Sequence, residues 1–275
     1  MANFVTVLSL ALLAMFYIAG ARKLRAGASC LHITAFAGGW VMLAVALAPP
    51  LHELAESRLW AHMVQHELLV LIAAPLLALG RLHLALLALF SRPSQRVAGR
   101  WIRRLRVSMP IAWALHAIAL WIWHLPALYE AAVDQPLLHA AQHASFLGTA
   151  LLFWWSVLDR RSGYGAAALY TFATSLHTGI LGALIFLTPQ PWYLTYGTGP
   201  AALKDQQLAG LIMWIPGGAA LAFTALCLLW HWLQDMERRV MERERLGLLS
   251  YRSTRSQITP MRLAIISTRD AEPRR

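Results

Sequence analysis

The sequence predicts an all-α, polytopic membrane protein with seven transmembrane helices. Of its 275 residues, 58% are hydrophobic and only 13% are charged, whereas about 25% of the residues of a soluble domain are charged. Several apolar runs approach the roughly 20 residues that a helix needs to cross a bilayer. We therefore expect the lipid bilayer to surround most of the chain.

The apolar runs divide the chain into seven expected spans within one transmembrane domain, residues 1–232. The first run has no charge before it, and Arg22 and Lys23 follow it. A signal peptide carries its positive charge ahead of the apolar run, so this run is expected to be retained as a span. Pro75 predicts a kink in the third span. The spans cover about 3–20, 31–47, 60–79, 109–125, 137–158, 166–187 and 208–232.

The segments outside the spans are expected to be interfacial or cytoplasmic. Leu82–Phe90 and Val97–Leu105 mix apolar and basic residues, which is typical of helices at the membrane surface. The loop 188–207 is rich in proline, glycine and the aromatic residues that favour the membrane–water boundary. The basic tail, residues 233–275, is expected to begin as a helix and to continue as a disordered, polar segment.

The distribution of basic residues predicts the orientation of the chain. With seven spans, 22 of the 24 lysines and arginines lie on the side of the tail, and only Arg58 and Lys204 lie on the other side. Positive residues accumulate on the cytoplasmic side, so the N-terminus is expected outside and the C-terminus in the cytoplasm. The net charge of +11 is then a topology signal, and we expect no nucleic-acid partner.

One pattern, Glu-x8-His-x2-Gln-His, occurs twice, at 53–66 and 130–143. Histidines four residues apart share one face of a helix. The expected topology places both copies on the outer face, with His62 and His139 one turn inside a span and His66 and His143 one turn deeper. Four imidazoles at matched depth on two helices predict a metal site.

Further residues are candidates to complete or support this site. His124 ends the fourth span, and Met213 lies in the outer third of the seventh; a thioether ligand favours Cu(I) among the metals that imidazole binds. Gln65 and Gln142 are expected either to fix imidazole tautomers or to join helices by hydrogen bonds. Glu67 is a candidate proton carrier or histidine partner inside a span, and Asp205 is an outer acid that could attract cations.

Three alternatives to a copper-binding protein remain open at this point. A haem-binding or redox membrane protein would use histidine pairs, such as His116 and His177, as axial ligands. A copper transporter would use the same histidines, and in a metal-free scaffold they would only pack and form hydrogen bonds. No nucleotide-binding loop, HExxH or GxSxG motif is present, so no hydrolytic or nucleotide-binding site is expected.

Three segments carry a recognisable combination of motifs. They are His62-Met-Val-Gln-His66-Glu-Leu-Leu with Ala74-Pro-Leu-Leu-Ala-Leu-Gly80, Trp123-His-Leu-Pro-Ala-Leu-Tyr129 followed by His139-x3-His143 and Phe153-Trp-Trp155, and Asp205-Gln-Gln207 leading to Met213-Trp-x-Pro-Gly-Gly218. Together they resemble the CtaG family of integral-membrane cytochrome c oxidase assembly factors, associated with caa-type oxidases and unrelated to the single-span copper chaperone of the same label. The resemblance covers about residues 40–230.

The resemblance implies a plasma (inner) membrane protein that helps to form an active haem–copper oxidase, through copper handling and without catalytic turnover. It extends the candidate set to Gln207 and implies oxidase subunits or their copper chaperones as partners. We therefore expect an assembly factor that delivers copper, with haem as the alternative cofactor. The sequence leaves the oligomeric state open, a homo-oligomer included. The expected ligands are His62, His66, His124, His139, His143 and Met213.

Overall fold

The computed structural model describes residues 2–24, 29–91, 108–159 and 163–269, and every regular element in these ranges is helical. The expectation of an all-α fold is thus confirmed. The expected surface segment Val97–Leu105 lies outside the described residues. The main helices are α1 (Ala2–Lys23), α2 (Cys30–Leu47), α3 (Leu51–Ser57), α4 (Leu59–Glu67), α5 (Ala74–Leu79), α6 (Leu82–Ala88), α8 (Met109–Trp123), α9 (Pro126–Asp134), α10 (Pro136–Leu158), α11 (Tyr164–Leu187), α12 (Pro200–Ile212) and α13 (Gly218–Arg269).

Five helical segments among the described residues are long and apolar enough to cross a membrane. They are Val5–Lys23, Cys30–Leu47, Leu59–Leu79, Tyr164–Leu187 and Pro200–Leu246. The pair α8 and α9, which is bent by 77°, makes a sixth if it counts as one span. Large apolar side chains such as Ile118 and Ile180 are more than half exposed, as expected for helices that face lipid. The chain is therefore a multi-pass membrane protein.

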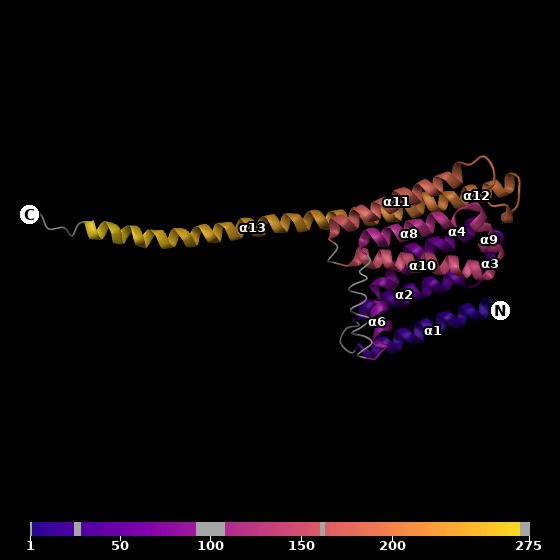
Figure 1. Ribbon diagram of the computed structural model, residues 1–275, viewed down its shortest axis with the longest axis horizontal. Coiled ribbons are helices and arrows are strands. Elements are labelled where there is room, and N and C mark those ends of the chain that lie inside the picture. Colours follow the sequence, from indigo (N-terminus) through magenta and orange to yellow (C-terminus); the bar gives the residue numbers. More distant parts are fainter. Residues whose placement is uncertain (1, 25–28, 92–107, 160–162, 270–275) are drawn as a thin grey trace, which may run out of the picture. The chain divides into compact units, whose positions relative to one another are not determined.

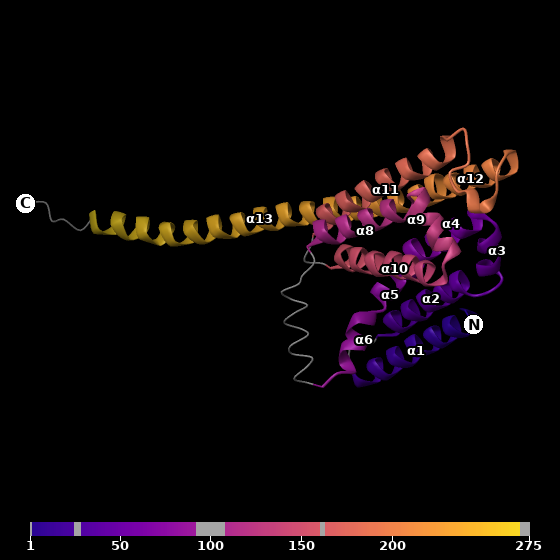
Figure 2. The same ribbon diagram turned by 45° about the vertical axis from the view of Figure 1, so that its right-hand side comes forward.

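The unit Met1–Leu228 is a bundle in which helices distant in sequence pack side by side. Helix α10 packs against α5 and α8, α11 packs against α8 and α12, and α12 packs against α4; Figures 1 and 2 show these helices together. The contact between α11 and α12 is close, because a Cβ on Gly210 would lie 2.6 Å from the Gly182 carbonyl oxygen. Small residues permit such backbone contacts between membrane helices.

Both copies of the repeated pattern form the same structural unit. In each copy a short helix, α3 or α9, ends at one extended residue, and a longer helix, α4 or α10, begins immediately after it. The extended residues are Arg58 (φ −136°, ψ 121°) and Gln135 (φ −120°, ψ 112°). Each lies four residues before the first histidine of its copy and accepts that histidine's backbone N–H. The shared break gives His62 and His139 equivalent positions in the first turn of their helices.

Two of the expected loops begin or end differently in the structure. Helix α12 begins at Pro200, so the expected loop 188–207 ends eight residues earlier; proline at the first helical position is pre-organised for a helix start. The residues between α8 and α10, expected as a short loop, form α9, which also begins with a proline, Pro126. Helix α12 packs against α4, and α9 packs against α10, so both proline-initiated helices contact a helix that carries histidines of the repeated pattern.

The third span contains a wide helical turn, the π-helix η1 (Leu68–Ala73), directly before Pro75. The proline has no N–H, so the carbonyl of Val70 has no donor five residues ahead, while Ala74 donates to Leu69. The indole of Trp154 donates to that carbonyl at 2.8 Å. The sequence predicts a kink at Pro75, and the structure accommodates the proline as this π-turn, which is compensated by a neighbouring helix.

The described part of the second unit, which begins at Leu229, consists of the rest of α13, up to Arg269. The sequence predicts that the tail becomes disordered, whereas the structure continues the helix to Arg269. Glutamate, arginine and methionine have high helix propensities, and Arg239 pairs with Asp235 one turn earlier at 2.7 Å. These local terms favour a helix without any packed core.

Candidate metal centre

Six histidines converge on one region of the bundle, from α3, α4, the end of α8 and α10. The ring centroids of His62 and His66 lie 4.5 Å apart, and those of His139 and His143 lie 4.4 Å apart. The rings of the two copies also meet each other, because His62 lies 5.0 Å from His139. The structure thus brings together His62, His66, His124, His139 and His143, with His52 at the edge.

Within this group, His62, His139 and His143 form the tightest set, which we call the triad. One ring nitrogen from each lies within 4.8 Å of the others. Imidazoles that share a metal at about 2.0–2.1 Å have ring centres roughly 5–6 Å apart. The triad centroid distances of 4.4, 5.0 and 5.7 Å are close to this range, so small rotations would direct all three rings at one ion.

Six buried ring nitrogens of the cluster lack hydrogen-bond partners. The Nε2 atoms of His62, His66, His124, His139 and His143 have none, and neither does Nδ1 of His66. A buried polar atom without a partner is costly, by about 1–3 kcal/mol, and natural proteins hold few of them. Six such atoms at one place fit a ligand that supplies the missing contacts, and a metal ion is the ligand that imidazole lone pairs bind.

Neighbouring groups set the tautomers of two of these rings. Nδ1 of His124 lies 2.7 Å from the Leu120 carbonyl, which can only accept, so Nδ1 carries the proton. Nδ1 of His62 lies 2.9 Å from the Tyr196 hydroxyl, which donates its own proton to the Ala55 carbonyl at 3.1 Å. His62 must therefore donate from Nδ1 as well. In both rings, Nε2 is left with a lone pair, which is the form that binds a metal.

Tyr196 belongs to the loop between α11 and α12, outside the spanning segments, and the sequence interpretation missed its role. Burial raises the pKa of Tyr196 well above the usual value for tyrosine, so its hydroxyl stays protonated and can donate to Ala55. Tyr129 also lies 3.4 Å from this hydroxyl. The only signal in the sequence was the aromatic character of the loop, which membrane-interface preference explains equally well.

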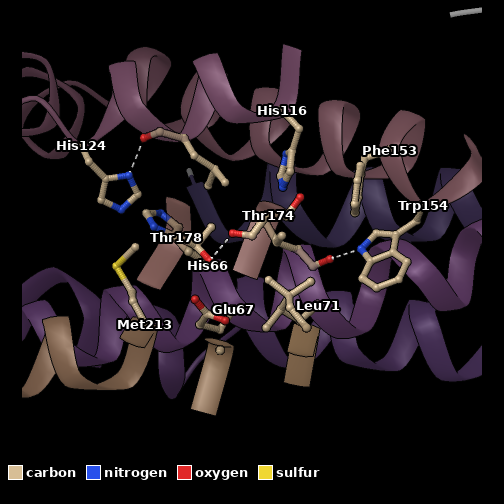
Figure 3. A pocket seen from close by; sticks show the side chains of 14 residues that line it. His66, Glu67, Leu71, His116, His124, Phe153, Trp154, Thr174, Thr178 and Met213 are labelled. Carbon is tan, nitrogen blue, oxygen red and sulfur yellow. Dashed lines mark hydrogen bonds between the residues drawn. The ribbon is translucent and has the colours of Figure 1, made fainter. Parts of the chain in front are cut away.

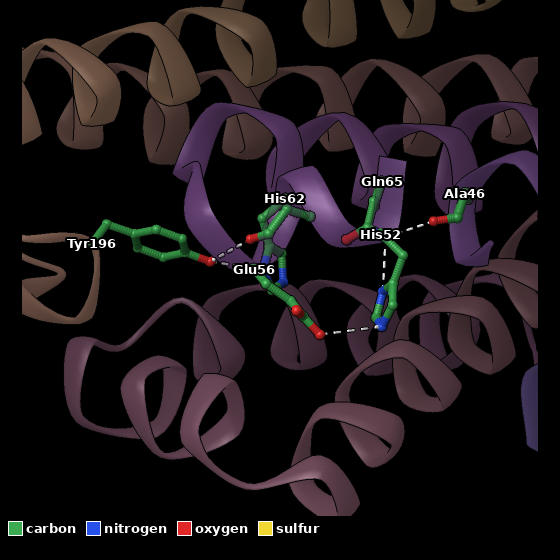
Figure 4. A network of polar contacts seen from close by, with 7 residues as sticks. Ala46, His52, Glu56, His62, Gln65 and Tyr196 are labelled. Carbon is green, nitrogen blue, oxygen red and sulfur yellow. Dashed lines mark hydrogen bonds and ion pairs between the residues drawn. The ribbon is translucent and has the colours of Figure 1, made fainter. Parts of the chain in front are cut away.

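His52 lies at the edge of the cluster, with its side chain 17% exposed, and Figure 4 shows it between Gln65 and Glu56. The side-chain amide of Gln65 donates to the Ala46 carbonyl and to Nδ1 of His52, at 3.3 Å for the latter. On its other side, Nε2 of His52 lies 3.8 Å from the Glu56 carboxylate. Gln65 is therefore a positioning residue that connects α2, α3 and α4, and its amide nitrogen faces these acceptors.

A small cavity adjoins the cluster between α4, α8, α11 and η4 (Met213–Gly217), another π-helix. The volume that the centre of a water molecule can occupy in it is ≈ 20 Å³, which is enough for about one water or one ion. Figure 3 shows His66, Glu67, His116, His124 and Met213 around this space. Glu67 packs directly on Gly217, where an added Cβ would lie 2.7 Å from a carboxylate oxygen. The structure thus places Glu67 and Met213 with His66, His116 and His124 around the cavity, which none of the triad histidines lines.

The remaining candidates have different positions. Gln142 is fully buried between His139 and His143 on α10, and both atoms of its amide lack a partner. Asp205 does not line the cluster, because its carboxylate accepts the backbone N–H groups of Leu59 at 3.0 Å and Trp60 at 3.2 Å. It therefore caps the first turn of α4. Gln207 is half-buried on α12 and makes none of the described contacts with the histidines.

The fold and the site together define a class: a multi-pass helical membrane protein with a buried histidine cluster suited to a metal ion. The model of the cytochrome c oxidase caa3 assembly factor family (Caa3_CtaG) matches residues 15–235. The chain belongs to this family, as its resemblance to CtaG proteins predicts, and the family links it to cytochrome c oxidase assembly. No curated protein and no solved structure matched the chain in the comparisons.

Proposed function

We propose that this protein binds copper, favouring Cu(I), in the histidine cluster and delivers it to a haem–copper oxidase during assembly. The observation that carries the proposal is the convergence of the two repeated His-x3-His pairs, with the triad nitrogens within 4.8 Å of each other and five buried Nε2 atoms unpaired. Copper is the cargo, and the protein has no turnover reaction of its own.

The choice of copper rests on the donor set and on the oxidase assembled by the family. Neutral imidazole binds several transition metals, but a thioether such as Met213 selects Cu(I) among them. A single positive charge is also the least costly metal charge to bury in a membrane. The cavity beside His66, His116 and His124 has room for about one water molecule. This space suits an ion and is far too small for a porphyrin.

The proposal includes the full topology. We infer that α10, which has 23 residues but carries two histidines and a glutamine, also crosses the bilayer in the plasma membrane. This gives seven spans, with the N-terminus outside, the tail in the cytoplasm and the cluster near the outer face. Labelling of Lys204→Cys by a membrane-impermeant thiol reagent in a cysteine-free background tests the orientation, since the label would react from the outer side only.

Copper binding by the triad is tested with purified protein and a Cu(I) competition titration. We expect the variant His62→Ala/His139→Ala/His143→Ala to lose high-affinity copper, because it removes the three nitrogens that lie closest together. The matched control is His83→Ala, since His83 lies outside the cluster, with its ring centroid 4.4 Å from that of Trp155. Equal copper binding in the wild type and the triple variant would sink the proposal.

A further inference from the structure

The cavity beside the cluster carries donors that the triad does not use. His116, on α8, is 1% exposed and lines the cavity. Its Nδ1 lies 3.0 Å from the Thr149 hydroxyl, and this hydroxyl donates to the Ser145 carbonyl at 2.7 Å. His116 must therefore donate from Nδ1, which leaves a lone pair on Nε2, and that atom has no partner.

His124 presents the same chemistry to the same space. Its Nδ1 proton goes to the Leu120 carbonyl, so its unpaired Nε2 is also a bare lone pair. His66 lies between the two regions, because its ring is 4.5 Å from His62 in the triad and 5.9 Å from His124 at the cavity. Both nitrogens of His66 are unpaired, and a neutral imidazole has one lone pair at a time. The proton can therefore sit on either nitrogen, and the ring can offer its lone pair to one side or to the other.

The cavity also has an anionic and a soft donor. Glu67 lines it, and a carboxylate beside a monovalent cation gives a neutral pair, which lowers the cost of burying either charge. Met213, 4% exposed, supplies a thioether on a side chain with three rotatable bonds. Both residues adjoin π-helical turns, η1 and η4, and such turns occur frequently at functional sites.

We propose that this cavity is a second Cu(I) position, filled from the triad through His66. Its ligands come from His116, His124, Glu67 and Met213, with His66 as the ring between the two positions. These donors surround the space without meeting at a point, so binding draws the flexible side chains of Met213 and Glu67 toward the ion. The inference rests on the proposed copper function and adds to it a stoichiometry of two and a path of internal transfer.

The test compares copper equivalents and sulfur coordination in four purified proteins. The inner variant is Glu67→Gln/Met213→Leu, which keeps side-chain size, and the outer variant is His139→Ala/His143→Ala. Met109→Leu is the control, because Met109 is buried in the core and does not line the cavity. We expect two Cu(I) per chain in the wild type and in the control, and one in either variant. X-ray absorption should show a sulfur neighbour that disappears in the inner variant only.

The outcomes separate this inference from the proposed function. A wild-type protein that binds one copper, lost in the outer variant, overturns the second position and leaves the proposed function intact. Two equivalents in the inner variant, or a sulfur neighbour that persists in it, would assign the second copper to another place and also overturn the inference. A wild-type protein that binds no copper contradicts the proposed function itself.

Discussion

The protonation of single imidazole nitrogens determines what the cluster can bind. His62, His116 and His124 each donate a hydrogen bond from Nδ1 to a neighbouring oxygen. The acceptors are the hydroxyls of Tyr196 and Thr149 and the carbonyl of Leu120. Each ring then presents an unprotonated Nε2 to a space without other hydrogen-bond partners. Oxygens that accept a hydrogen bond from Nδ1 orient metal-binding histidines and raise the basicity of Nε2. The cluster is thus arranged as a set of lone pairs, and a purely hydrogen-bonded scaffold would pair them.

Tyr196 is the residue outside the cluster that most directly supports this arrangement. We expect Tyr196→Phe to weaken Cu(I) binding by about 10–100-fold, the usual effect of losing a group that orients a ligand. The His62 ring would lose the acceptor that holds its tautomer and orientation. A chelator competition titration measures the change. Tyr164→Phe serves as a control at a distant tyrosine, and unchanged affinity in Tyr196→Phe would contradict the role assigned to the hydroxyl.

At the scale of the elements, the break between a short and a long helix places the histidines. Arg58 and Gln135 have nearly the same extended conformation, at equivalent positions of the two copies. The break starts a new helix, so the first histidine of each copy falls in the first turn and the second histidine one turn deeper. The pattern Glu-x8-His-x2-Gln-His is therefore the sequence of one structural unit used twice.

Helix α4 begins at the break of the first copy, and Asp205 on α12 caps its first turn. We expect Asp205→Ala to lower the stability by about 0.5–2 kcal/mol, the usual range for a lost cap, because Leu59 and Trp60 lose the acceptor of their N–H groups. Thermal or denaturant unfolding in detergent measures this, with the exposed neighbour substitution Lys204→Ala as the control. The copper stoichiometry should not change, whereas a loss of one copper equivalent would make Asp205 a ligand.

At the scale of the whole molecule, the sequence predicts the helices well because apolar runs and basic flanks are local signals. The helix from Leu59 to Leu79 and those of α1, α2 and α11 lie within a few residues of the expected spans. The cluster is also predictable in part, because histidines four residues apart share a face and the two copies repeat the spacing. The meeting of the two copies in space is what the structure adds.

Other features depend on contacts between distant segments and leave no local pattern. The hydroxyl of Tyr196 reaches His62 from 134 residues away, and the carboxylate of Asp205 reaches α4 from 146 residues away. An isolated aspartate in an outer segment looks the same whether it binds a cation or caps a helix. The division of the histidines into a triad and an inner cavity likewise depends on which helices pack against α4, and composition does not encode this.

The central claim is delivery of copper through this cluster, and the copper content of the oxidase tests it most directly. The oxidase would be purified from cells whose only copy of this protein is the variant His62→Ala/His139→Ala/His143→Ala, and from cells with His83→Ala at equal membrane abundance. The claim predicts an oxidase deficient in copper in the first cells and a fully loaded oxidase in the second. A fully loaded oxidase in both, assembled at the wild-type rate in medium with limiting copper, would contradict it.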